Sequence, residues 1–233
     1  MKIEICANSY QSALNAQLAG ADRIELCSEL SIGGITPSMG MLQQVVQDIN
    51  IVIHVLIRPR SGDFCYSKQE FDIMKKDIEI CKSLGINGIV SGVLLNNHEI
   101  DINGTKELIE ISKPLSFTFH RAFDCIKNPM EGLQALIDLK VDRVLTSGQK
   151  AKAIDGLPLL QLLLKHANNK IIILPGSGIN SSTIEVFQAS GFQEIHTSAS
   201  TKVNNHLPFF DSSLQTVSDL NKIKELVKLV RYA

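Results

Sequence analysis

The chain lacks an excess of charge of either sign. Its 23 Lys and Arg residues stand against 24 Asp and Glu residues, which gives a formal net charge of -1 over 233 residues. It therefore lacks the positive electrostatic field that would attract nucleic acids or anionic membranes. It also lacks any apolar run close to the roughly 20 residues of a membrane span. The opening MKIEICANSY is not a charged leader followed by a long apolar stretch, so we expect no signal peptide and no membrane span.

Zinc-type cysteine spacing is missing as well. The five cysteines are an odd number, and no two of them form a CxxC pair. Together with the expected absence of an export signal, this predicts reduced thiols in the cytoplasm. Hydrophobic residues make up 44% of the chain and charged residues 20%, which suits one folded domain with a substantial core.

Short apolar runs alternate with amphipathic stretches along the whole chain. The clearest helical stripe places Phe71, Met74, Ile78 and Cys81 on one face. Such alternation predicts parallel strands joined by helical crossovers. Eight strands are expected, at Ile3–Cys6, Arg23–Cys27, Ile51–Arg58, Gly88–Ser91, Leu115–His120, Arg143–Thr146, Lys170–Leu174 and Glu194–Thr197.

Four junctions between a helix and the next strand resemble one another. They are Ala19–Ile24, Leu84–Ile89, Leu139–Val144 and Ser190–Ile195, and each places a polar residue before an apolar strand. Three carry a glycine where a helix C-cap needs positive φ, and Lys140 is the exception. Four similar quarters favour a single TIM-like (β/α)8 barrel over residues 1–233, with an open doubly wound sheet as the alternative.

In several of the predicted strands only one parity is apolar, although parallel strands covered by helices normally read as unbroken apolar runs. Because side chains alternate along a strand, the polar parity points into the barrel or its mouth. This inward set comprises Glu4 and Cys6, Glu25 and Cys27, His54 and Arg58, Thr118 and His120, and His196 and Ser198. A purely structural barrel would use Val, Ile and Leu there, so we favour a functional site over a set of mutually neutralising ion pairs.

The loops after the predicted strands are rich in arginine and glycine. Arg58 and Arg60 flank a rigid proline, and pairs of guanidinium groups suit carboxylate or phosphate recognition. Small residues after later strands can leave backbone N–H groups free for an anion. We therefore predict an anion site formed by Arg58 and Arg60 with Ser147, Gly148, Gly176, Ser177 and Gly178. In the Gly-rich loop after the second strand, Ser38 is a plausible N-cap for the next helix.

These loop sequences resemble the CutC family of copper homeostasis proteins. The resemblance runs in order through Glu4-Ile5-Cys6, Ala21–Cys27, Gly33–Ser38, Ile57–Phe64, Thr118–Asp124, Leu145–Gly148, Pro175–Gly178 and His196. Ser61 and Ser177 depart from glycines that are usual in the family, and neither change removes a predicted ligand. The resemblance implies a TIM-like barrel, a cytoplasmic protein, self-association to a homo-oligomer and a link to copper.

The same resemblance implies that Cys6 and Cys27 bind Cu(I), for which soft thiolates are suited. They end neighbouring strands, which run about 4.8 Å apart, so one ion can reach both sulfurs. The alternative is that both are ordinary buried apolar residues. Cys65 and Cys125 lie in loops near the predicted mouth, and Cys81 belongs to the core.

An enzyme is the alternative function. Glu25 and His120 would form an acid–base pair, with Asp124 orienting the imidazole or a nearby arginine. Glu4 and His54 are further catalytic candidates on the inward parity. The substrate would be a small phosphorylated or carboxylated compound held by the arginines. The inward parity of the predicted strands carries no lysine, which argues against Schiff-base chemistry.

Overall fold

The computed structural model describes residues 1–203 and 215–231. Its central sheet consists of β1 (Lys2–Ala7), β2 (Arg23–Leu26), β3 (Val52–Leu56), β4 (Gly88–Ser91), β5 (Ser116–Phe119), β6 (Arg143–Thr146), β7 (Ile172–Pro175) and β8 (Glu194–Thr197). Each begins and ends within two residues of the bounds that the sequence periodicity predicts.

Helices alternate with these strands. They are α1 (Tyr10–Ala19), α2 (Met39–Asp48), α3 (Lys68–Ser83), α4 (Ile102–Ser112), α5 (Pro129–Asp138), α6 (Leu157–Ala167), α7 (Ile184–Ala189) and α8 (Leu220–Arg231), with 3₁₀ turns η1 (Leu30–Ile32) and η2 (Arg121–Cys125) after β2 and β5. Side-chain caps start several of them. The hydroxyl of Ser38 accepts a hydrogen bond from the Met41 N–H at 3.2 Å, as predicted. Ser67 and Glu70 form a reciprocal capping box at the start of α3.

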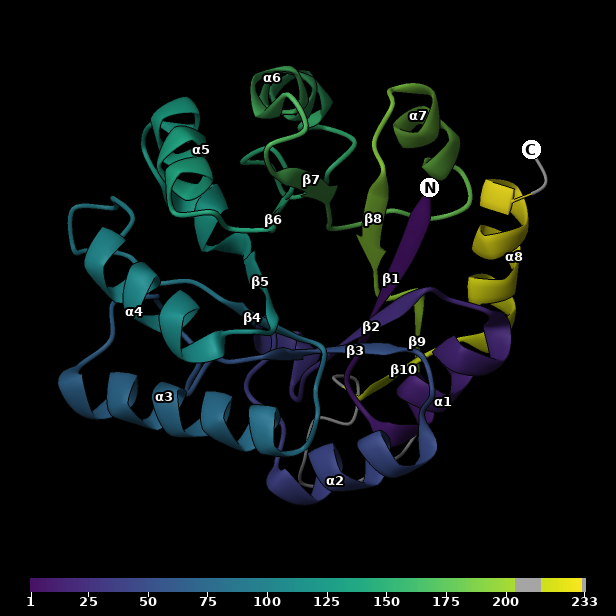
Figure 1. The fold of residues 1–233 in the computed structure, drawn as a ribbon. Helices are drawn as coiled ribbons and strands as arrows, with labels where there is room; N and C mark the ends of the chain where they lie inside the picture. Colours follow the sequence, from purple (N-terminus) through teal and green to yellow (C-terminus); the bar gives the residue numbers. More distant parts are fainter. Residues whose placement is uncertain (204–214, 232–233) are drawn as a thin grey trace, which may run out of the picture.

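The strands form a nearly closed barrel. Neighbouring strands pair in parallel in the order β7-β6-β5-β4-β3-β2-β1-β8. A parallel bridge between Gly176 and His196 then brings β7 against β8. The helices surround the strands (Figure 1). The structure thus confirms the predicted (β/α)8 barrel and excludes the open sheet, in which two edge strands would be left unjoined.

The four similar junctions share one backbone conformation. Gly20, Gly85 and Gly191 have φ angles of 83°, 75° and 85°. Lys140, which breaks the glycine pattern in the sequence, has a φ of 60° and takes the same left-handed conformation. The chain therefore makes the same turn at all four places, and at Lys140 it does so with a side chain that disfavours it.

The two parities of the strands face different surroundings, as predicted. Ile5, Ile24 and Phe119 are fully buried in the large apolar core that includes the helices. On the opposite parity, Cys6, Cys27, Leu56 and Val90 form a separate small cluster. The polar side chains of Glu4, Glu25, His54 and His120 share that inward parity, and each is at least nine-tenths buried.

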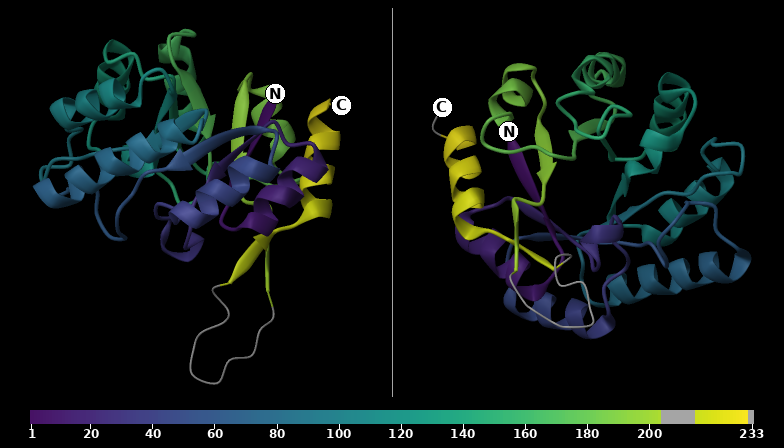
Figure 2. Two further views of the ribbon diagram at one scale, coloured as in Figure 1. Left: turned by 60° about the horizontal axis from the view of Figure 1, so that its bottom comes forward. Right: turned by 180° about the vertical axis from the view of Figure 1, so that it is seen from behind.

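An antiparallel hairpin that the sequence analysis did not predict follows β8. It consists of β9 (Ser200–Lys202) and β10 (Thr216–Ser218), and it projects beyond the ring of helices in the left view of Figure 2. The Asn8 side chain donates to Thr216, and the Ser218 N–H donates to the Ser12 hydroxyl at 3.0 Å. These bonds attach the hairpin to α1 and to the residue that follows β1. None of the helices described has the length and apolar character needed to cross a membrane.

Candidate functional site

A cavity of about 780 Å³ opens at the carboxyl ends of the strands, where the active sites of (β/α)8 enzymes lie. Of the residues predicted to form a site, the cavity is lined by Cys6, Glu25, Arg58, His120, Asp124, Ser177 and Gly178. The remaining predicted residues lie outside its wall: Glu4, Cys27, His54, Arg60, Ser147, Gly148 and Gly176. The sequence thus predicted the position of the cavity, and half of the predicted site residues line its wall.

An ion-pair network occupies the barrel interior deeper than the cavity. The guanidinium of Arg23 is paired with Glu4 through Nε and with Glu194 through Nη2, the latter at 2.5 Å. Arg143 Nε donates to the same Glu194 oxygen at 2.9 Å. Burial alone would raise the pKa of Glu4, but Arg23 and a hydrogen bond from His196 hold it well below its ordinary value. Part of the polar interior is therefore a structural network, the alternative that the sequence left open.

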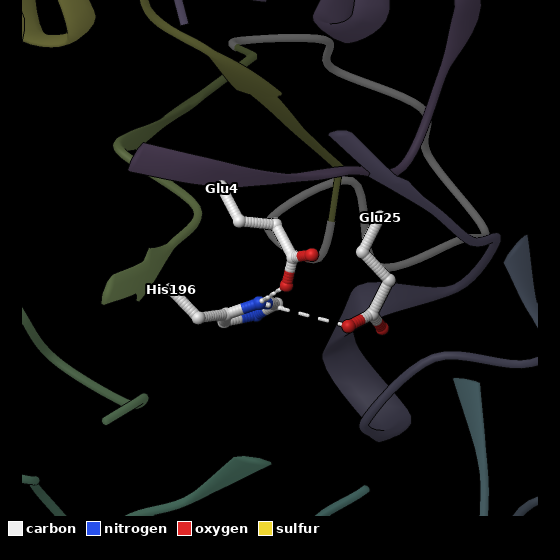
Figure 3. Close-up of side chains that lie close together, drawn as sticks. All are labelled: Glu4, Glu25 and His196. Carbon is white, nitrogen blue, oxygen red and sulfur yellow. Dashed lines mark hydrogen bonds and ion pairs between the residues drawn. The ribbon is translucent and has the colours of Figure 1, made fainter. Parts of the chain in front are cut away.

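His196 joins this network to the cavity, because it contacts Glu4 and lines the cavity wall. Figure 3 shows its ring between Glu4 and Glu25. Its Nδ1 lies 2.7 Å from Glu4 Oε1 and 3.6 Å from Glu25 Oε2. Burial raises the pKa of Glu25 to about 7, against the charge of His196, which acts to lower it. Burial would lower the pKa of His196, but Glu25, together with hydrogen bonds to Cys6 and Glu4, raises it well above the ordinary value. These directions make His196 the hydrogen-bond donor to the Glu4 carboxylate, beside the Glu25 carboxyl group.

The other two inward imidazoles are held neutral. Burial lowers the pKa of His54 to about 4, and burial together with Arg58 lowers that of His120 to about 3. The Nδ1 of His120 accepts a hydrogen bond from the Ala122 N–H at 3.2 Å, so its proton is on Nε2. That Nε2 has no hydrogen-bond partner among the residues described. The imidazole beside Glu25 is therefore that of His196, whereas His120, predicted as the acid–base partner, is a neutral donor elsewhere in the cavity wall.

Asp124 orients an arginine and accepts hydrogen bonds at the end of β6. Its carboxylate accepts hydrogen bonds from Arg121 Nε at 2.8 Å and from the Thr146 hydroxyl at 2.5 Å. The Ser147 N–H and hydroxyl donate to it as well. Of the two roles that the sequence analysis allowed for Asp124, the structure shows the contact with a nearby arginine.

The two arginines predicted for anion binding have different surroundings. Arg58 is buried and donates to the carbonyl oxygens of Ile32, Gly34 and Gly62, each within 2.9 Å. Its Nε has no hydrogen-bond partner in the part of the chain that the structure describes. Arg60 instead pairs with Glu70 at 2.5 Å and with Asp63 at 3.0 Å. Its side chain is about one-third exposed and lies outside the cavity wall. Arg58 therefore holds the loop after β2 in place, and Arg60 holds the loop after β3.

Several backbone groups predicted to bind an anion already have acceptors. The Ser147 N–H donates to Asp124, the Gly148 N–H donates to the Thr146 hydroxyl, and the Gly176 N–H donates to the Thr146 carbonyl. The first bond ties the end of β6 to η2, the second is local to the end of β6, and the third ties the ends of β6 and β7 together. From this predicted group only Ser177 and Gly178 reach the cavity.

The two inward cysteines lie side by side. The Sγ atoms of Cys6 and Cys27 are 3.7 Å apart, and both thiols are free. Cys6 lines the cavity, while Cys27 is fully buried behind it. The hydrogen bond with Cys27, followed by burial, raises the pKa of the Cys6 thiol well above its ordinary value. Cys125 is exposed at the cavity wall, whereas Cys65 does not reach it.

Sequence reasoning placed His196 on the inward parity but did not select it as a site residue. It also passed over Arg23, Arg143 and Glu194, which stand at the starts of predicted strands. These three residues could have been found from the sequence, because they are charged, begin predicted strands and share the inward parity. A search restricted to strand ends misses them.

Fold and site together define a (β/α)8 barrel protein with a cavity at the carboxyl ends of its strands, lined in part by ionisable side chains, and with two adjacent thiols of which one lines the cavity. The profile of the CutC family matches residues 1–201, and the chain belongs to that family.

Named relatives agree with this assignment. The human copper homeostasis protein cutC homolog is 44% identical over 220 residues, which are 94% of this chain and 81% of that protein. The family protein CutC of Glaesserella parasuis is 40% identical, with 99% of each chain covered. A crystal structure of a CutC protein from Streptococcus agalactiae matches with a TM-score of 0.80 at 30% identity, covering 85% of this chain and 98% of that one.

Proposed function

We propose that the protein binds Cu(I) through Cys6 and Cys27, as the cargo of a copper homeostasis function. The observation that carries this proposal is the 3.7 Å separation of the two sulfur atoms. Metal–thiolate bonds of about 2.3 Å at a near-tetrahedral angle place two sulfurs about 3.8 Å apart. Thiolates are also the ligands that select Cu(I) among biological metals. The pair therefore fits one ion without movement of β1 relative to β2.

The surroundings of the pair favour uptake of a soft cation from the cavity. Cys6 lines the cavity wall, so an ion reaches Cys27 by way of Cys6. Leu56 and Val90 form one apolar cluster with the two cysteines. The nearby carboxylate of Glu25 adds negative charge.

Anaerobic competition titration with a chromophoric Cu(I) chelator tests the proposal. The native protein is compared with Cys6→Ser, Cys27→Ser and the double variant, and Cys125→Ser is the matched control because Cys125 lines the same cavity but lies apart from the pair. Loss of Cu(I) affinity in the first three variants and not in the control supports the site. Equal binding by all five proteins shows that the two cysteines only pack.

The same proposal places the protein in the cytoplasm, because Cu(I) binding by this pair requires reduced thiols and a reducing compartment. Thiol-reactive labelling in intact cells tests the redox state. Self-association, which the family resemblance implies, stays a prediction that sedimentation velocity checks.

A small anionic ligand is the second candidate, and one observation favours it. Arg58 Nε and His120 Nε2 are buried donors without a partner among the residues described, and both residues line the cavity. Unpaired buried donors destabilise a fold by about 1–3 kcal/mol each, which an acceptor oxygen would relieve. Thermal-shift titration with phosphate and with small carboxylates tests this. Protection that persists unchanged in both Arg58→Leu and His120→Phe argues against binding at these donors.

A further inference from the structure

Three ligand atoms converge in the barrel interior, apart from the two sulfurs. Glu4, Glu25 and His196 each direct one oxygen or nitrogen atom toward a common point, and these atoms lie within 4.8 Å of one another. The residues come from β1, β2 and β8, which are adjacent in the sheet. Figure 3 shows the side chains pointing toward one another. All three are at least nine-tenths buried, which distinguishes the cluster from acidic groups gathered on a surface.

One of these atoms has no hydrogen bond to satisfy it. Glu25 Oε2 accepts no hydrogen bond from any residue that the structure describes, although its side chain is only 5% exposed. It is directed at His196 Nδ1, 3.6 Å away, which is beyond hydrogen-bond distance. A buried carboxylate oxygen in this position has an ion-pair partner in His196 but no donor that satisfies it by a hydrogen bond.

We infer that Glu4, Glu25 and His196 form a binding site for a divalent transition-metal ion of borderline softness, such as Zn²⁺ or Co²⁺. Imidazole nitrogen with two carboxylate oxygens suits such ions better than it suits Cu(I). Bonds of about 2.0–2.1 Å at near-tetrahedral angles place ligand atoms about 3.3 Å apart. The observed separations of 2.7 Å and 3.6 Å lie on either side of this value. An ion at this point would take the place of the proton between His196 and Glu4 and would satisfy Glu25 Oε2.

The surroundings have the organisation that metal sites need. Arg23 holds the second oxygen of Glu4, and Glu194 holds Arg23 in turn, so the ligand is oriented from behind. Three carboxylates, from Glu4, Glu25 and Glu194, face two guanidinium groups, from Arg23 and Arg143, so the interior has an uncompensated negative charge when His196 is neutral. Glu25 and His196 line the cavity while Glu4 does not, so a fourth ligand would enter from the cavity side.

This site shares no ligand with the proposed Cu(I) pair, although His196 forms a hydrogen bond with Cys6. Co²⁺ distinguishes the two, because thiolate ligation gives an intense charge-transfer band that oxygen and nitrogen ligands do not. Chelator-stripped native protein is titrated with Co²⁺ and followed by visible absorption and calorimetry. The same titration is run on Glu25→Gln, His196→Gln and the Cys6→Ser/Cys27→Ser double variant. Glu29→Gln is the matched control, because it makes the same change at an exposed residue outside the cavity wall.

We expect one Co²⁺ per chain with ligand-field bands and no thiolate band, unchanged in the double cysteine variant and in Glu29→Gln. Glu25→Gln and His196→Gln should each weaken binding by about tenfold or more, since loss of even an outer-shell partner typically costs 10–100-fold. Anomalous scattering from Co²⁺-soaked native crystals locates the ion without any variant, in case the variants do not fold. An ion found at the cysteines, no ion at all, or affinity unchanged in both ligand variants overturns the site. Failure of the Cu(I) titration leaves it standing.

Discussion

Replacement of Arg23 by methionine removes the cation that two buried carboxylates share. Arg23 pairs with Glu4 and Glu194, and all three side chains are at most 6% exposed. Breaking a buried pair by removal of one partner costs about 3–5 kcal/mol, because the remaining charge stays buried and uncompensated. In a chain of this size each kcal/mol lowers the melting temperature by roughly 2–4 °C, so we expect a decrease of about 6–20 °C.

The effect should depend on pH in a defined direction. The folded-state pKa of Glu4 lies below its unfolded value of 4.5, so its contribution is fully present above that value and is lost as the pH falls. Without Arg23 the folded-state pKa values of Glu4 and Glu194 rise. As the pH falls, these two carboxylates therefore take up protons at a higher pH in the variant than in the native protein. The difference in unfolding free energy between the two proteins should therefore narrow as the pH falls from about 8 to about 5.

Thermal melts followed by circular dichroism measure the melting temperature, and urea denaturation followed in the same way measures the unfolding free energy at each pH. Arg60→Met is the matched control, because Arg60 forms its ion pairs with Glu70 and Asp63 while 36% exposed. Exposed pairs contribute about 0–1 kcal/mol, so this variant should remain close to the native protein. The reasoning is refuted if Arg23→Met loses no more stability than Arg60→Met, or if its deficit grows as the pH falls.

Three other predictions follow from single sites. Cu(I) affinity should fall with decreasing pH, because the Cys6 thiol has a raised pKa and must release its proton to bind the ion. Competition titrations that give the same affinity at every pH would contradict the role of Cys6 as a ligand. The His120 ring should remain neutral down to about pH 5, since burial lowers its pKa to about 3, and a midpoint near 6.5 in an NMR titration would contradict its buried position. Gly34→Ala should destabilise by about 1–3 kcal/mol, because φ is +83° and the new Cβ would lie 2.7 Å from Leu56 Cδ2. Gly40→Ala in α2, with nothing within 4 Å, should instead stabilise by about 0.5–1 kcal/mol, and thermal melts of the two variants compare them.

The polar interior combines both explanations that the sequence allowed. Arg23 and Glu194 form compensated ion pairs deep in the barrel. Nearer the cavity, Glu25 Oε2 and His120 Nε2 have no hydrogen-bond partners in the described part of the chain. In a structural ion pair the polar atoms of both partners have hydrogen-bond partners. These two atoms have none, and they therefore point to ligands.

The particular contacts at the site depended on partners that are distant in the sequence. Glu25 lies beside His196, which is 171 residues further along the chain, and not beside His120, the partner predicted from residue type. Arg58 donates to three loop carbonyls, and Arg60 pairs with Glu70. Residue type shows what an arginine can bind, whereas loop geometry decides which acceptor reaches it first.

The sequence by itself determined the alternation of strands and helices, the parity of each strand and the cap at Ser38, because periods of 2.0 and 3.6 residues and local φ preferences are written in neighbouring residues. It also brought Cys6 and Cys27 to adjacent strand ends, since one βα unit separates them. Only the tertiary structure decided which groups meet across the barrel. The stagger of the strands and the near closure of β7 on β8 set the heights of Glu4, Glu25 and His196, and no local period encodes that stagger.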